Sequence, residues 1–170
     1  MIPSSVTHIG DNAFDNNSIS SIIIPNSVTT LGKQAFSYND LTSVIIPNSV
    51  ESIGSYAFAY NNLSSVFLSD NITVIESTTF QYNKLTSIVI PEGVTSIGNT
   101  AFGYNLLESV SIPSSVKVIG STAFNDNNLA AINIPNGVTS IGSQSFGFNK
   151  LNEQIKNWAV GEKDVKKTKK

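Results

Sequence analysis

Apolar and polar positions along this chain recur with a period of 22 residues. Seven phenylalanines mark the period without a gap or an insertion: Phe14, Phe36, Phe58, Phe80, Phe102, Phe124 and Phe146. An asparagine lies three residues after each of them, and a Leu or Ile lies two residues after each asparagine. Self-similarity at a fixed period is the signature of a repeat architecture. We therefore expect a solenoid of stacked coils.

Each unit has two parts. The first, L-x-x-[IV]-x-[IL], alternates apolar and polar residues and is typical of a short strand with one buried face, as in residues 41–46. A proline then ends the strand, because it has no N–H to donate and a fixed φ. The second part, P-x-x-V-x-x-I-G-x-x-A-F, is expected to form a turn with a short helical return. Six parallel strands would then form a sheet on the concave face.

Three further columns refine this picture. Asparagine beside a leucine column predicts buried side chains that bond to loop backbone, because buried polar groups are almost always hydrogen-bonded. The proline and glycine columns each fail once, at Ser69 and Glu76, and both failures fall in one degenerate unit. Drift of the repeat explains this unit most simply, and a cation site at Glu76 and Asp70 is the alternative.

The repeat L-x-x-[IV]-x-[IL]-P-x-x-V-x-x-I-G-x-x-A-F, present from residue 2 to residue 151, resembles the BspA-like class of leucine-rich repeats. Members of that class commonly carry Cys where this chain carries Asn, in a slightly longer unit. The resemblance implies a leucine-rich-repeat solenoid that serves as a binding module of bacterial cell-surface or secreted proteins. A β-helix is the alternative fold, and Gly-x-x-Ala-Phe favours a turn over the second long strand that a β-helix needs.

The repeat also divides the chain. Residues 1–150 are expected to form the solenoid, with an incomplete first unit whose apolar flank is uncovered. The spacing of Leu151, Ile155 and Trp158 predicts a capping helix over residues 151–160. Residues 161–170 read as a charged, disordered tail. We interpret the chain as a fragment of a longer surface protein, lacking its signal peptide, and as a monomer or part of that longer chain.

Composition excludes several functions. With no Cys and a single His, the chain has no disulfide scaffold, thiol nucleophile or His-paired zinc site. We find no catalytic constellation, so no enzyme activity, metal or cofactor is expected. No apolar run approaches the roughly 18 residues of a membrane span. Residues 1–150 carry four Lys and nine acidic residues, a formal charge of −5, and residues 151–170 carry +3, a pattern that does not favour nucleic acid.

Candidate binding residues lie between the buried positions of the predicted strands. One row on the concave face is apolar over four units: Ile23, Ile45, Phe67 and Val89. Small serines lie two residues before it, among them Ser43, Ser65 and Ser87. Exposed apolar patches often mark contact sites. The alternative is that β-branched residues simply favour strands, or that another part of the parent protein covers them.

A second, weaker candidate is a row of tyrosines: Tyr38, Tyr60, Tyr82 and Tyr104. They are expected either to bind glycan or protein or to pack ring against ring. Taken together, these observations predict a non-catalytic adhesion or protein-interaction module. Its expected partner is a host or matrix protein, with a glycan as a further option. The rival interpretation is a structural spacer that binds no ligand of its own.

Overall fold

The structure is a computed structural model that describes residues 1–151. Leu151, the last of the leucine column, is buried with 3% of its surface exposed. The rest of the predicted capping helix, residues 152–160, and the predicted tail, residues 161–170, lie outside the described residues.

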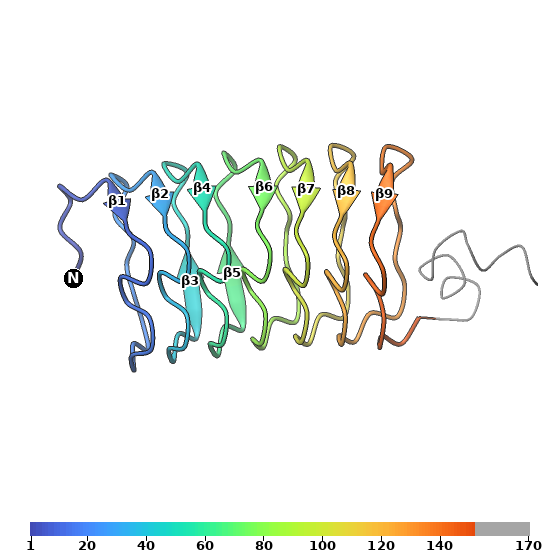
Figure 1. The fold of residues 1–170 in the computed structure, drawn as a ribbon, viewed down its shortest axis with the longest axis horizontal. Helices are drawn as coiled ribbons and strands as arrows, with labels where there is room; N and C mark the ends of the chain where they lie inside the picture. Colours follow the sequence, from blue (N-terminus) through green and yellow to red (C-terminus); the bar gives the residue numbers. More distant parts are fainter. Residues whose placement is uncertain (152–170) are drawn as a thin grey trace, which may run out of the picture.

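The coils follow one another along the long axis of the molecule, so that the chain forms a parallel-strand β-solenoid (Figure 1). Each paired strand meets the residue 22 positions further along the chain, as His8 meets Thr30. One sheet contains β1 (His8–Ile9), β2 (Thr30–Leu31) and β4 (Ser52–Ile53). A second contains β6 (Val74–Ile75), β7 (Ser96–Ile97), β8 (Val118–Ile119) and β9 (Ser140–Ile141). A third contains β3 (Ser43–Ile45) and β5 (Ser65–Phe67).

Most strands form at a different place in the repeat from the predicted one. Within residues 1–151, only β3 and β5 lie before the proline position, with one isolated bridge between Val89 and Ser111, so the expected six-strand sheet is wrong. The other strands follow the proline position, in the segment expected to return the chain. These segments pair as strands only in the two coils between which the other ladder is interrupted, from β4 to β6. At the start of each segment an asparagine accepts the backbone amide instead, as Oδ1 of Asn61 does from the N–H of Leu41 at 3.0 Å.

The predicted short helical return is also wrong, since residues 1–151 contain no helix. The return path is a run of turns with two left-handed residues per coil, such as Tyr56 (φ 62°) and Tyr60 (φ 56°). Its alternate amides donate to the next coil, as the N–H of Phe58 does to the carbonyl of Thr79 at 3.0 Å. A helix would use these amides within its own turns, so stacking favours the open path.

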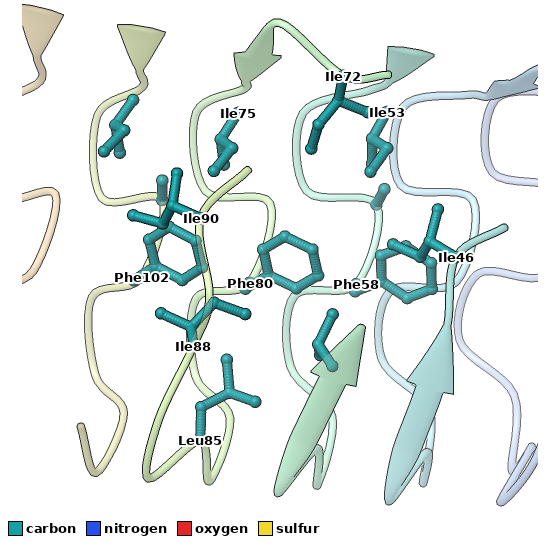
Figure 2. Close-up of a cluster of buried hydrophobic side chains, with 14 of the residues drawn as sticks. Ile46, Ile53, Phe58, Ile72, Ile75, Phe80, Leu85, Ile88, Ile90 and Phe102 are labelled. Atoms are coloured by element: carbon teal, nitrogen blue, oxygen red, sulfur yellow. The ribbon is translucent and has the colours of Figure 1, made fainter. Parts of the chain in front are cut away.

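A continuous file of phenylalanines fills the centre of the solenoid, as the repeat predicts. Figure 2 shows Phe58, Phe80 and Phe102 in line, with aliphatic side chains above and below. The rings of all seven stack on their neighbours, with centroids 5.2 to 5.7 Å apart and planes within 12° of parallel. The five central rings have no exposed surface. Each coil therefore buries its apolar residues against the coils on either side.

Buried asparagines tie each coil to the one before it, which confirms the expected role of this column. Asn83, with 7% of its surface exposed, accepts the N–H of Leu63 on Oδ1 at 3.0 Å. Its Nδ2 donates to the carbonyls of Phe58, Phe80 and Gln81 at 2.9, 3.2 and 3.3 Å. The same four bonds recur at Asn61, so one side chain per coil satisfies backbone groups that the open path would otherwise leave unpaired.

Candidate binding faces of the solenoid

The side chains of the apolar row point away from the core. Residues before and after each of them, such as Val44 and Ile46, are buried or partly buried, so the period-two alternation leaves the middle residue outside. We use the name "apolar row" for four large side chains that are each between 66% and 82% exposed: Ile23, Ile45, Phe67 and Val89. The exposure that the sequence predicts for this row is present on four consecutive coils.

Small polar side chains stand beside the apolar row. Ser43, Ser65 and Ser87 are exposed two residues before Ile45, Phe67 and Val89. The register of β3 and β5 pairs Ser43 with Ser65 and Ile45 with Phe67, so the two rows run in parallel along the solenoid axis. Further along the chain the apolar row gives way to exposed Ser111 and Asn133, and the apolar surface is therefore limited to the first four of these coils.

The tyrosine row forms a stacked ladder. Centroids of Tyr38 and Tyr60 are 4.3 Å apart, those of Tyr60 and Tyr82 are 4.7 Å apart, and those of Tyr82 and Tyr104 are 4.4 Å apart. Packing of each ring on its neighbour, one of the two predicted arrangements, is thus confirmed. The inner faces of the rings cover one another, and the ladder presents ring edges and hydroxyl groups to solvent.

The ladder has two properties that the sequence reasoning missed. All four tyrosines are left-handed, with φ between 51° and 57°. Asn16 and Asp126 occupy the equivalent positions at the two ends of the row, and Asn and Asp tolerate this conformation best, so the sequence did carry a signal for it.

Burial raises the pKa of Tyr60, as does the neighbouring Tyr38 hydroxyl. Burial likewise raises the pKa of Tyr82, with a smaller effect of Tyr104.

An open apolar cavity of about 510 Å³ lies at the N-terminal end of the stack. Ile2, Phe14, Ile19 and Ile22 are among its lining residues. Phe14 stacks on Phe36 on one side only, within the described coils.

The single histidine of the chain, His8, is exposed on the first coil. The ring nitrogen Nδ1 of His8 lies 2.8 Å from the hydroxyl of its neighbour Thr7, on the exposed surface of the first coil. Residues 1–151 contain no group of three or more His, Cys, Asp or Glu side chains arranged to hold a metal ion, so Glu76 and Asp70 belong to no such group. In the same range, no helix has the length and apolar character to cross a bilayer.

Comparison with known proteins identifies the repeat. A family model described as the BspA type leucine rich repeat region matches six copies, over residues 1–107 and 73–160. The chain belongs to this family. Its 22-residue unit is thus a BspA-type repeat in which the coil-to-coil bonds described above are made by asparagine.

Solved structures of bacterial leucine-rich repeat proteins agree with this fold. A leucine-rich repeat protein from Eubacterium ventriosum is 26% identical over 89% of this chain, with a TM-score of 0.69. Another from Bacteroides ovatus is 23% identical over 84% of this chain, with a TM-score of 0.60. This chain spans 43% and 45% of the lengths of those two proteins. No curated protein matches it significantly in sequence.

Proposed function

We propose that this BspA-type solenoid is a non-catalytic interaction module of a bacterial cell-surface or secreted protein, and that it binds a protein partner through the apolar row. The exposure of Ile23, Ile45, Phe67 and Val89 in register on consecutive coils carries the proposal. Membership of the BspA-type family supports the surface location.

The apolar row is both contiguous and rigid. Single exposed apolar residues are common on any protein, whereas a contiguous row is the pattern of contact surfaces. Four coils at a strand spacing of about 4.8 Å place the row over about 14 Å. Buried neighbours such as Val44 and Val66 hold the backbone of the row in place, so little conformational entropy is lost when a partner binds.

A protein partner fits this surface better than a glycan. Sugar rings stack on the open faces of aromatic side chains, and in the tyrosine ladder the neighbouring rings already cover these faces. Within the apolar row, Phe67 is the one aromatic side chain. Its aliphatic neighbours are suited to contact with apolar side chains of another polypeptide.

A binding assay on immobilised, purified extracellular-matrix proteins tests the proposal. We expect the wild-type chain to bind at least one of them and Phe67→Ser to weaken that binding at least tenfold. The melting temperature should stay unchanged, because the Phe67 side chain is 66% exposed. Phe148→Ser is the matched control, since Phe148 is 75% exposed and lies in the row of the tyrosine ladder.

The outcomes distinguish binding through the apolar row from binding through the tyrosine ladder, and both from a spacer without a ligand. Loss of binding in Tyr82→Ser but not in Phe67→Ser would move the site to the tyrosine ladder. If no matrix protein binds the wild-type chain above background, the spacer interpretation is favoured over the interaction module.

A further inference from the structure

Acidic side chains border the apolar row, and lysines do not. Three rows flank it on the same coils: one at the serines, one at the residue before each serine, and one at the turn after the proline position. On the coils of the apolar row, the flanking rows contain two exposed acidic residues, Asp70 and Glu92, and exposed Glu108 lies on the next coil. None of the four lysines in residues 1–151 falls in them; the nearest in sequence to Val89 is Lys84, at the start of the same segment.

The acidic groups sit at defined places relative to the apolar side chains. Asp70 and Glu92 each follow a residue of the apolar row by three positions, at the same turn of adjacent coils. Asn48, one coil earlier, fixes Asp70: its Nδ2 donates to Oδ2 of Asp70 at 3.1 Å, and its Oδ1 accepts the Asp70 N–H at 2.9 Å. The carboxylate of Asp70 is thus held at the rim of the apolar row before any partner arrives.

We infer that the partner of the apolar row is a polypeptide segment whose apolar side chains are flanked by lysine or arginine. The apolar row would receive the apolar side chains, while Asp70 and Glu92 would receive the cations at the rim. This inference rests on the proposed function and narrows the class of partner. The formal charge of −5 over residues 1–150 also favours a positively charged partner at longer range.

The two parts of the surface have different tasks. Desolvation of the apolar row supplies most of the affinity. Exposed charges at a rim chiefly accelerate association and discriminate against partners of the wrong charge, and their effect weakens with salt. Arginine gains most at these positions, since its planar group can form two parallel hydrogen bonds with one carboxylate.

A selection of random 12-residue peptides displayed on phage tests the inference, with the wild-type chain as bait and Phe67→Ser as counter-selection bait. We expect enriched peptides to combine apolar residues with Lys or Arg. The affinity of the synthesised peptides should be at least fivefold lower for Glu92→Lys than for the wild-type chain. For the wild-type chain it should also fall at least fivefold when NaCl is raised from 50 to 500 mM. Glu51→Lys is the matched control: Glu51 is exposed but lies beside β4, and its substitution should change binding less than twofold.

Each outcome is decisive. Enriched apolar peptides with acidic or neutral flanks, or equal losses in Glu92→Lys and Glu51→Lys, would overturn the charge preference while leaving the proposed function intact. Recovery of the same peptides on wild type and Phe67→Ser would overturn both.

Discussion

The regular coils differ from the single degenerate coil at the glycine and proline positions, which Glu76 and Ser69 occupy in the degenerate coil. In the regular coils a glycine closes the turn, and a Cβ added at Gly54 or Gly98 would lie 2.5 Å from a backbone nitrogen of the preceding coil. The glycine N–H of these coils reaches the preceding coil at 2.8 and 2.7 Å. In the degenerate coil Glu76 has a Cβ, and its own N–H makes no such backbone bond within the described coils.

The consequence is a seam in the solenoid. The hydrogen-bond ladder between strands, which runs through β1, β2 and β4, stops there and resumes at β6 (Figure 1). Across the seam, the centroids of Phe58 and Phe80 are 5.7 Å apart and those of Tyr60 and Tyr82 are 4.7 Å apart, the widest spacing in each file. The same two coils are the ones that pair as β3 and β5. In this pair of coils, the pairing between β4 and β6 is absent and the pairing between β3 and β5 is present.

The apolar core and the hydrogen-bond ladder between strands are separate determinants of stacking. At the seam Ser69 replaces proline, and its hydroxyl donates to the carbonyl of Val50 at 2.6 Å. The phenylalanine file and the asparagine bonds continue through the degenerate coil without interruption. Loss of the ladder at one position is therefore tolerated as long as these two networks persist.

Replacement of Asn83 gives the largest expected effect. Asn83→Ala leaves several buried backbone groups without partners and should lower the free energy of unfolding by about 3 kcal/mol. Urea titration followed by circular dichroism measures the loss. Asn105→Ala, in a regular coil with the same bonds, should cost a similar amount. A much smaller loss at Asn83 would mean that the seam weakens the asparagine network as well.

Transfer of the defect into a regular coil should have the next largest effect. Gly98→Glu places a Cβ against the backbone of Ser77, and we expect destabilisation of about 2 kcal/mol from overpacking. Thermal melts provide the measurement. Gly10→Glu is the matched control, because nothing lies within 4 Å of a Cβ at Gly10. Equal effects at the two positions would contradict the steric explanation.

Repair of the seam should have a smaller effect of opposite sign. Glu76→Gly removes the obstructing Cβ, allows the N–H of residue 76 to reach the preceding coil, and should stabilise the chain by about 1 kcal/mol. Glu76→Ala keeps the Cβ and should not. If the alanine variant gained as much as the glycine variant, removal of the charge would be the cause.

High pH should act weakly on the same coil pair. Folding raises the pKa of Tyr60 and Tyr82 above the ordinary value of 10.0. Their contribution to stability is therefore present below about pH 10 and lost as the pH rises through the higher folded values. Melting temperatures from pH 8 to 11 should fall less steeply in Tyr60→Phe. Tyr56→Phe removes only the smallest of the contributions that raise the pKa of Tyr60 and should change the slope less than Tyr60→Phe does.

Much of the molecule follows from the period alone. Rows of identical spacing predict the phenylalanine file, the buried asparagines and the exposure of Ile45 and Phe67, because stacked coils bring residues 22 apart into contact. The strands were less predictable. The alternation in residues 41–46 describes a half-buried extended segment correctly, but it does not say whether its amides pair with another strand or with an asparagine.

The sequence by itself determined the repeat, its family and the side of each segment that faces the core, since burial depends on the order of apolar residues along one coil. Only the tertiary structure decided where neighbouring backbones come close enough to pair. That distance depends on contacts between coils, such as the fit of Gly98 against Ser77, and on their absence at Glu76. The stacking of the tyrosines and the acidic rim are likewise decided by the tertiary structure, because both exist only once successive coils lie side by side.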